Sequence, residues 1–373
     1  MPKETLRVGI IGAGRWAQFA HLPAWSRQQN VKLVWVCDID EALAGQMSKE
    51  YNAPHATTNW QKVVSRPDLD IIDICTPSQT HYEIAQAAIA SGKHVLCEKP
   101  VNYDFRKTLA LSQEAKRKRL KTKLGFTFRY TPGVRYAKSL IDEGFVGRPL
   151  IFNGYEQNSQ WLNPQTPLRD SQVKTEKPGI NVASLEGYGA PIIDISRWWV
   201  GADYTSVVGT MRNFIPERAI RGKTGLHRVN IDDGDVFLAE YANGAFATIQ
   251  TSFCTVGNFP GVEARFYGDK GAIIVRVVEE FGVPETVRAA KPDSIEYKQL
   301  DIPRRFFPRD YVPGESARNT FYTNLVTDFV EEIHDGGARN QGNFDDGAWV
   351  QEMINAVEIS HHQRRWVDLP LPR

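Results

Sequence analysis

The sequence has few cysteines, no long apolar run and almost no net charge, and each of these shortages excludes a class of protein. Its four cysteines lie far apart among 373 residues and match no zinc-binding spacing, so we interpret them as reduced thiols that pack as small hydrophobic side chains and expect no metal site. No window approaches the roughly 18 to 20 apolar residues of a membrane span, and the first residues lack the apolar run of a signal peptide. The 45 Lys and Arg residues nearly balance the 44 Asp and Glu residues, so no overall field attracts nucleic acid or an anionic membrane. We therefore expect a cytoplasmic protein that binds neither nucleic acid nor membrane.

Length and composition predict a globular protein of two domains. Hydrophobic residues make up 42% of the chain and charged residues 24%, which is enough apolar material for a sizeable core. Domains commonly contain about 100 to 200 residues, so two are expected. A change of pattern along the chain predicts a first domain over residues 1–128 and a second over residues 129–373.

The first third of the chain alternates short apolar runs with stretches of helical periodicity. Strands are expected at residues 6–11, 31–37, 71–75, 94–97 and 122–128. Helices are expected at residues 16–25, 41–51, 60–65, 81–91 and 105–118. Strand and helix in repetition predict an α/β fold with a parallel sheet covered on both faces.

From residue 150 onward, longer strand-like segments are joined by glycine-containing turns. Strands are expected at residues 206–210, 235–241, 245–253, 264–267 and 272–277, and Asn243-Gly244 is typical of a hairpin. Helices at residues 191–200, 322–334 and 347–362 are expected to cover one face of an open, mainly antiparallel sheet. Residues 158–183 and 213–230 have weak periodicity and are interpreted as long loops. These features predict an α+β second domain.

A dinucleotide-binding motif follows the first expected strand. Gly12-Ala13-Gly14-Arg15-Trp16-Ala17 opens a helix, and glycines in this context allow the backbone to approach a pyrophosphate at the positive end of that helix. The second strand ends in Asp38, where a carboxylate can accept hydrogen bonds from both ribose hydroxyls. The same carboxylate would repel a 2′-phosphate, and neither Ile39 nor Asp40 offers a cation to bind one. NAD is therefore the expected cofactor.

Further motifs give the chain a resemblance to a known family. They are Glu98-Lys99-Pro100, Thr76-Pro77-Ser78-Gln79-Thr80-His81, Gly125-Phe126-Thr127-Phe128-Arg129-Tyr130, residues 144–149, residues 194–201 and residues 366–370. In these positions the sequence resembles the Gfo/Idh/MocA oxidoreductases over nearly its whole length. The resemblance implies an N-terminal Rossmann domain and a C-terminal domain with a large open sheet that often forms oligomer contacts, so a homodimer or homotetramer is expected.

The resemblance also implies a reaction and a set of site residues. The usual chemistry is hydride transfer between nicotinamide and a secondary hydroxyl or ketone of a sugar or cyclitol, with Lys99 as the catalytic residue. A lysine suits this step because an ammonium stabilises a developing alkoxide and a buried amine can exchange the proton. The implied cofactor contacts are Gly12, Gly14, Arg15, Trp16, Asp38, Thr76, Pro77, His81, Glu98, Lys99 and Arg129. The implied substrate contacts are Lys99, Tyr130, Tyr155, Tyr188 and Asp194.

The second catalytic motif of the family, D-x-G-x-H-x-x-D, is altered in this chain. Aligned on Asp194, the first Asp is replaced by Gly187 and the His by Pro191, neither of which can exchange a proton. Tyr188 and Glu186 are the nearest titratable groups, and Tyr188 is the expected second catalytic residue. The alternative is that Tyr188 only packs beside the glycine-rich turn.

Two alternatives stay open from the sequence alone. The basic loop with Arg212, Arg218, Arg221, Lys223, His227 and Arg228 is either solvated or in a subunit contact, or it holds an anionic substrate group. The altered second motif also leaves room for a redox-neutral glycosidase that oxidises, eliminates, hydrates and reduces its substrate with the same NAD. A non-catalytic NAD-binding sensor is a third class, against which the intact Glu98-Lys99-Pro100 speaks.

Overall fold

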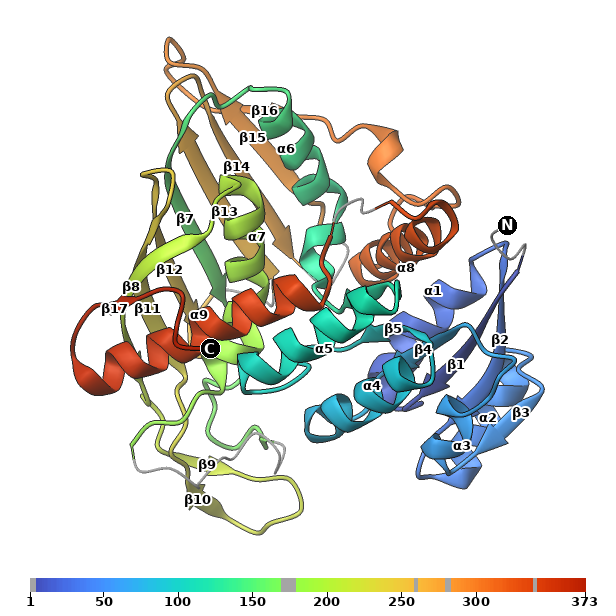
Figure 1. Ribbon diagram of the computed structural model, residues 1–373. Helices are drawn as coiled ribbons and strands as arrows, with labels where there is room; N and C mark the ends of the chain where they lie inside the picture. Colours follow the sequence, from blue (N-terminus) through green and yellow to red (C-terminus); the bar gives the residue numbers. More distant parts are fainter. Residues whose placement is uncertain (1–4, 169–178, 258–260, 279–282, 338–340) are drawn as a thin grey trace. The chain divides into compact units, whose positions relative to one another are not determined.

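Six parallel strands form the sheet of the first of two compact units in the computed structural model (Figure 1). The model describes residues 5–168, 179–257, 261–278, 283–337 and 341–373. The strand order is β3-β2-β1-β4-β5-β6, with bounds β1 Leu6–Ile11, β2 Val31–Cys37, β3 His55–Thr57, β4 Ile71–Ile74, β5 His94–Cys97 and β6 Thr122–Leu124. The order reverses between β1 and β4, and in such sheets ligands bind beyond the carboxyl ends of the strands at this point. The predicted Rossmann architecture is confirmed.

The helices of the first unit follow the periodicity of the sequence. They are α1 Leu22–Ser26, α2 Glu41–Glu50, α3 Trp60–Val64, α4 His81–Ala90 and α5 Phe105–Arg117. Asp40 and Asp104 cap the N-termini of α2 and α5 with their carboxylates. Between the glycine-rich turn and α1 the chain forms one π-helical turn, Ala17–His21, a geometry often found at functional sites.

The fifth expected strand was wrong in its second half. β6 ends at Leu124, and residues Thr127–Tyr130 form a 3₁₀-helix. At the end of β6, the backbone N–H of Leu124 donates to the carbonyl of Gly342, at 2.8 Å. This contact with a segment more than 200 residues away could not be read from local periodicity.

The first unit also takes in a late part of the chain. It comprises Met1–Tyr130 and Asp310–Trp349, and the second unit comprises Thr131–Arg309 and Val350–Arg373. Helix α8 (Ala317–Asp335), expected over the sheet of the second domain, therefore belongs to the first unit instead. Its apolar side chains Phe321, Tyr322, Leu325, Val326 and Phe329 pack with Leu6, Val8, Ala20, Trp25 and Ile71. Helical spacing revealed the apolar face of α8 but not the sheet that it covers.

The second unit is built on a mixed sheet of nine strands in the order β16-β15-β14-β13-β7-β12-β11-β8-β17. Their bounds are β7 Pro149–Gln157, β8 Tyr204–Arg212, β11 Gly234–Tyr241, β12 Phe246–Ser252, β13 Gly261–Gly268, β14 Ala272–Val278, β15 Thr286–Ala290, β16 Lys298–Leu300 and β17 Val367–Asp368. All neighbours are antiparallel except β7 and β12. The predicted large, mainly antiparallel sheet is confirmed, although β7, β15, β16 and β17 were not foreseen.

One face of this sheet is covered by helices. Paired residues on seven adjacent strands form a row across that face: Gly209, Phe237, Ile249, Gly154, Ala264, Val275 and Val287. A Cβ on Gly154 would lie 2.5 Å from Ile192 of α7 (Ala190–Val200), and one on Gly209 would lie 2.9 Å from Val357 of α9 (Phe344–Gln363). α7 and α9 can approach the sheet closely because these two positions lack side chains.

The loop predicted at residues 213–230 contains a small hairpin. Its strands are β9 (Glu217–Ala219) and β10 (Leu226–Arg228), which pair antiparallel. The other predicted long loop includes residues 169–178, which lie outside the described residues.

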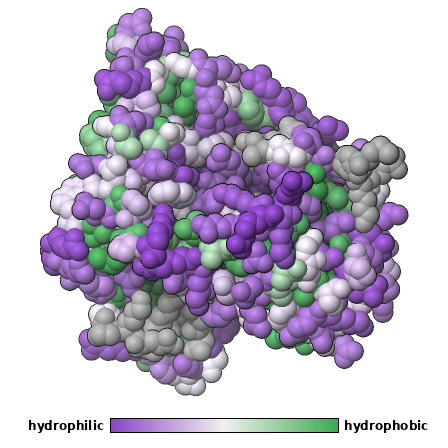
Figure 2. Space-filling view, viewed as in Figure 1, coloured by the Kyte–Doolittle hydropathy of each residue, from purple (hydrophilic) through white to green (hydrophobic). Residues whose placement is uncertain are grey.

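The protein surface is mainly polar on the face shown in Figure 2, where hydrophobic residues occur in scattered groups among hydrophilic ones. None of the helices in the described ranges is both long and apolar enough to cross a bilayer.

Candidate functional site

The glycine-rich turn after β1 has the conformation that a dinucleotide requires. Gly12 has φ +96°, and a Cβ there would lie 2.5 Å from the carbonyl oxygen of Cys75. Gly14 has open space where a Cβ would stand. Asp38, at the end of β2, accepts a hydrogen bond from the backbone N–H of Ala13 at 2.7 Å. The expected ribose-binding carboxylate is thus held beside the turn expected to bind the pyrophosphate, and these residues fit NAD.

His81 connects the turn after β4 to the turn after β5. One ring nitrogen lies 2.7 Å from the carbonyl oxygen of Thr76, and the other lies 2.8 Å from that of Pro100. The side chain is 1% exposed. Both nitrogens are therefore engaged with backbone carbonyls, so the ring connects the two turns, and the expected contact of His81 with NAD stays a prediction.

The hydroxyls of Ser78 and Thr80 do not cap α4. Thr80 donates to the hydroxyl of Thr76 at 2.8 Å and to the carbonyl of Pro77 at 2.9 Å. Ser78 lies 2.7 Å from the hydroxyl of Tyr103. Thr76 and Pro77 themselves remain at the carboxyl end of β4, where their predicted contacts with NAD stay a prediction.

Glu98, at the end of β5, accepts hydrogen bonds from three directions. Its Oε1 accepts from the indole N–H of Trp16 at 3.0 Å and from the hydroxyl of Tyr322 at 2.8 Å. Its Oε2 accepts from the backbone N–H of Lys99 at 3.3 Å. A Cβ on Gly125 would lie 2.5 Å from this carboxylate, so only glycine leaves room for it. Glu98 thus links the dinucleotide turn, the expected catalytic lysine and α8.

A buried imidazole balances the charge of Glu98. His21 is fully buried, with Nδ1 2.8 Å from Asp73 and Nε2 3.3 Å from Glu98. Burial lowers the pKa of His21, but the charge of Asp73 and its hydrogen bond outweigh burial and raise that pKa well above 6.5. Burial raises the pKa of Glu98, yet the hydrogen bond and charge of His21, together with the bonds from Tyr322 and Trp16, lower it to about 2. We call Trp16, His21, Asp73, Glu98 and Tyr322 the Glu98 cluster.

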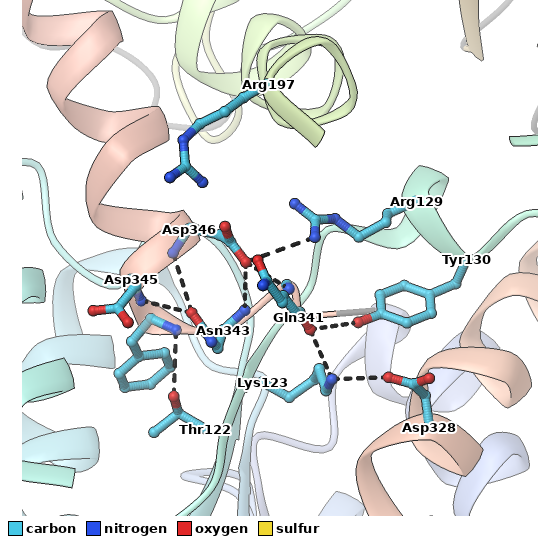
Figure 3. A network of polar contacts seen from close by, with 12 residues as sticks. Thr122, Lys123, Arg129, Tyr130, Arg197, Asp328, Gln341, Asn343, Asp345 and Asp346 are labelled. Atoms are coloured by element: carbon cyan, nitrogen blue, oxygen red, sulfur yellow. Dashed lines mark hydrogen bonds and ion pairs between the residues drawn. The ribbon is translucent and has the colours of Figure 1, made fainter. Parts of the chain in front are cut away.

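Tyr130 and Arg129 take part in a second polar network, shown in Figure 3. The hydroxyl of Tyr130 donates to the carbonyl of Gln341 at 3.0 Å, and its ring packs in the core of the first unit. Arg129 Nη1 lies 3.6 Å from a carboxylate oxygen of Asp346. The structure therefore places the Tyr130 ring in the core of the first unit, and its expected contact with substrate stays a prediction. Both residues are buried.

Lys123 anchors the same network. Its buried ammonium lies 3.0 Å from Asp328 and 2.6 Å from Glu332, and it also donates to the carbonyl of Gln341. Asp328 and Glu332 are on α8, so this ion pair fixes α8 and residue 341 to β6 (Figure 3). Because all three charges are buried, removing one partner would leave an uncompensated charge.

In the second unit, Tyr188 lies in the π-helical turn Leu185–Gly189 that precedes α7. Its hydroxyl donates to Oε1 of Gln160 at 2.7 Å, and its ring contacts Trp161 and Phe253. This environment includes the packing that was the alternative interpretation of Tyr188. Asp194 lies in α7 and is 1% exposed, and Pro191 is in the first turn of that helix.

Tyr155 faces away from α7. It alternates on β7 with Gly154 and Glu156, and Gly154 is the residue that α7 approaches. The guanidinium of Arg265 lies 5.3 Å from the Tyr155 ring centroid, on the uncovered face of the sheet. Within the second unit, Tyr155 and Asp194 are therefore on opposite faces of the sheet, and the structure does not bring these two expected substrate contacts together.

Buried carboxylates before and within β11 hold the segments around Tyr188. Asp232 accepts from the backbone N–H groups of Ala183, Ser184 and Leu185, the last at 2.8 Å. Asp235 accepts from the hydroxyl of Thr251 at 3.0 Å. Burial raises the pKa of both acids, and the neighbouring charge of Asp232 raises that of Asp235 well above 3.8.

Arg218, expected in a basic loop, is fully buried. Its guanidinium lies 2.9 Å from Asp233, which also accepts from the backbone N–H groups of Phe214 and Ile215. Arg218 is therefore part of an internal ion pair and does not belong to a solvated loop or an anion-binding fork. The other expected basic residues of the loop are not buried.

The Glu98 cluster contains three residues that the sequence did not single out, namely His21, Asp73 and Tyr322. One signal was present: Asp73 stands within the apolar run Ile71–Ile74, and a carboxylate in such a strand needs a buried partner. Its partner His21 lies 52 residues earlier. Only the folded sheet brings the two together.

Comparisons with known proteins agree with this site. Residues 6–126 match the family described as "Oxidoreductase family, NAD-binding Rossmann fold", and residues 134–274 match the GFO/IDH/MocA C-terminal domain. The chain belongs to the Gfo/Idh/MocA family and is an NAD-dependent oxidoreductase.

Its relatives include sugar and inositol dehydrogenases. Levoglucosan dehydrogenase of Pseudarthrobacter phenanthrenivorans is 25% identical over 98% of this chain and 99% of its own. The scyllo-inositol 2-dehydrogenase (NAD⁺) of Bacillus subtilis is 25% identical over 79% of this chain and 80% of its own. Among solved structures, an NAD-binding oxidoreductase from Klebsiella pneumoniae is 26% identical, with a TM-score of 0.85 and coverage of 99% and 100% of the two chains.

Proposed function

We propose that this oxidoreductase uses NAD to oxidise a secondary hydroxyl of a sugar, a cyclitol or a related molecule, with Lys99 as the catalytic residue. The observation that carries the proposal is the position of Lys99. It follows β5 at the carboxyl edge of the parallel sheet, where the turns after β1 and β4 present Gly12 and Thr76. The dehydrogenases of levoglucosan and scyllo-inositol among the relatives support a carbohydrate-like substrate.

Lys99 handles the proton in this proposal. NAD, when bound, accepts the hydride from the carbinol carbon. The Lys99 amine takes the hydroxyl proton, and the resulting ammonium stabilises negative charge on the reacting oxygen. Glu98 keeps the turn in place by accepting from the backbone N–H of Lys99, and not by acting as a proton acceptor itself, because its pKa is about 2.

Asp38 selects the cofactor. Its carboxylate would accept hydrogen bonds from the ribose hydroxyls, and each such bond to a charged acceptor is worth roughly 1.5 to 3 kcal/mol at most. Asp38→Ala should weaken NAD binding and reduce discrimination against NADP, as measured by calorimetry with both cofactors. Tighter binding of NADP than of NAD by the unmodified protein would refute this role.

Tyr188 is proposed as the second proton-handling group in place of the missing histidine. Tyr188→Phe retains the ring that packs against Trp161 and Phe253 and removes only the hydroxyl. Turnover should fall while NAD affinity stays the same. An unchanged turnover and pH profile would show that Tyr188 only packs, as its bond to Gln160 also allows, and would leave Lys99 as the one assigned catalytic group.

The substrate class can be tested with one panel. Purified protein is incubated with NAD and levoglucosan, inositols, glucose and aryl glycosides, and NADH and released aglycone are followed separately. Accumulation of NADH supports the dehydrogenase. Release of aglycone at trace NAD without NADH supports a redox-neutral glycosidase, and neither signal leaves a sensor. The expected cytoplasmic location and homo-oligomeric state stay predictions.

A further inference from the structure

The Glu98 cluster joins four parts of the first unit that are far apart in sequence. Trp16 and His21 stand at the start of the first crossover, Asp73 lies in β4, Glu98 directly follows β5, and Tyr322 lies in α8. The Tyr322 hydroxyl is 2.8 Å from Glu98 Oε1 and 2.6 Å from Nε2 of His21. A residue 224 positions from Glu98 therefore donates directly to the carboxylate beside Lys99.

Packing alone does not explain a tyrosine at this position. Tyr322 is fully buried among Leu, Val, Phe and Ala side chains, where phenylalanine would fill the space without a polar atom. A buried hydroxyl costs free energy unless it is hydrogen-bonded. This hydroxyl is hydrogen-bonded to Glu98 and His21, so its contribution lies in orienting those two groups.

The donors of the cluster form one consistent set when His21 carries a proton on each nitrogen. Nδ1–H then donates to Asp73, and Nε2–H donates to the oxygen of Tyr322. The Tyr322 O–H in turn donates to Glu98 Oε1, which leaves Oε2 to accept from the backbone of Lys99. Trp25 completes the set by donating to Asp73 at 2.7 Å. In this arrangement each carboxylate oxygen of Glu98 has a fixed direction.

We propose that Tyr322 and His21 are positioning residues that fix the Glu98 carboxylate and, through it, both the Lys99 turn and the helix start at Trp16. This inference rests on the proposed catalytic role of Lys99. Neither Tyr322 nor His21 touches the reacting atoms in this proposal. They act by setting the orientation of the backbone that presents Lys99. Small displacements of a catalytic group are costly for catalysis.

The test compares two buried tyrosines that lose the same atom. Tyr322→Phe removes the hydroxyl that donates to Glu98. Tyr204→Phe removes a hydroxyl that is also buried but bonded to Ser196 in the second unit, and it serves as the matched control. For the full chain we would measure kcat and KM with the substrate found in the panel, and NADH binding by fluorescence. The acetylation rate of Lys99 as a function of pH, followed by mass spectrometry, needs no substrate.

Tyr322→Phe should lower kcat by about tenfold or more with KM changed by less than about threefold, and it should change the acetylation profile of Lys99. Tyr204→Phe should leave kcat and the Lys99 profile unchanged even where its melting temperature falls. A Tyr322→Phe protein with kcat and acetylation profile like those of the unmodified protein would overturn the proposal.

Three further outcomes are decisive. If Glu98 transmits the effect, Glu98→Gln and Tyr322→Phe should not be additive in kcat, whereas additive losses would show that Tyr322 acts elsewhere. If Tyr322→Phe does not fold, His21→Gln is the second variant, because its amide can still donate to Asp73. It should show the same loss of kcat and the same change in the acetylation profile of Lys99. A His21→Gln protein without these changes would overturn the proposal. A changed Lys99 profile together with an active Lys99→Ala protein would support the positioning and refute the catalytic role of Lys99.

Discussion

The two units each bury a group of carboxylates, but they hold them in opposite ways. In the first unit Glu98 faces His21, Tyr322 and Trp16, and its pKa is lowered to about 2. In the second unit Asp235 is buried beside the carboxylate of Asp232, and its pKa is raised well above 3.8. Burial acts on both in the same direction, so the neighbours decide the charge. A charged carboxylate at the candidate site can orient donors, whereas Asp232, just before β11, serves to hold backbone.

The largest expected effect is a loss of turnover on removal of Lys99, which separates the catalytic role of Lys99 from the role of the buried carboxylates. Lys99→Ala should lower turnover by about a hundredfold to ten-thousandfold, because the group that exchanges the proton is lost. NAD affinity should stay the same, since Asp38 and the glycine-rich turn are unchanged, and calorimetry would check this. Lys32→Ala, at an exposed lysine of the same unit, is the control. Turnover of Lys99→Ala within about threefold of the unmodified protein would contradict the assignment.

Glu98→Gln tests the lowered pKa of Glu98 in the first unit. The pKa of Glu98 is lower in the folded protein than its ordinary value of 4.5, so the ionised carboxylate contributes stability above that value and loses it as the pH falls toward about 2. Glu98→Gln should therefore destabilise the protein near neutral pH by at most about 3 kcal/mol, and the deficit should shrink in acid. Urea unfolding at several pH values measures it.

The control for this measurement is Glu83→Gln, at an exposed glutamate of α4. It should change the free energy of unfolding little at any pH. A deficit of Glu98→Gln that stayed constant down to the most acid pH at which the protein folds would show that the cause is lost packing and not the lowered pKa.

Asp232→Asn tests the role of the second group of carboxylates in holding backbone. Asp232 accepts from three backbone N–H groups, and an amide can replace only one of its two acceptor oxygens. A loss of about 1 to 3 kcal/mol in the free energy of unfolding is expected for a buried donor left without its acceptor. Asp301→Asn, an exposed change in the same unit, should have no effect. Equal stability of the two variants would exclude the anchoring role.

The smallest expected effect is that of Asp235→Asn, whose change in stability has the opposite sign to that of Glu98→Gln. Because the pKa of Asp235 is raised in the folded protein, the folded state gains stability in acid and loses it as the pH rises from about 3.8 to the folded pKa. Asp235→Asn removes this dependence, so its melting temperature should exceed that of the unmodified protein by a larger margin near neutral pH than near pH 4. Calorimetry at several pH values would show this. A margin that grew in acid would reverse the sign and refute the raised pKa.

Local patterns in the sequence determined much of this protein. The alternation of apolar runs and helical periodicity predicted the parallel sheet of the first unit, since each strand and helix carries its own spacing. The cofactor was predicted from the glycines of residues 12–17 and from Asp38. The reaction class followed from the family resemblance, to which the motif Glu98-Lys99-Pro100 contributes. Of the helices, even α8 was foreseen as an amphipathic segment.

Tertiary structure decided what depends on pairs far apart in the sequence. Leu124 at the end of β6 donates its backbone N–H to the carbonyl of Gly342, and α8 is tied to the first unit by the ion pairs of Lys123 with Asp328 and Glu332. Arg218 was expected at the surface but is paired with Asp233. Tyr322 reaches Glu98 across 224 positions. The charge of a buried group follows from the neighbours that surround it, and those neighbours are set only when the chain has folded.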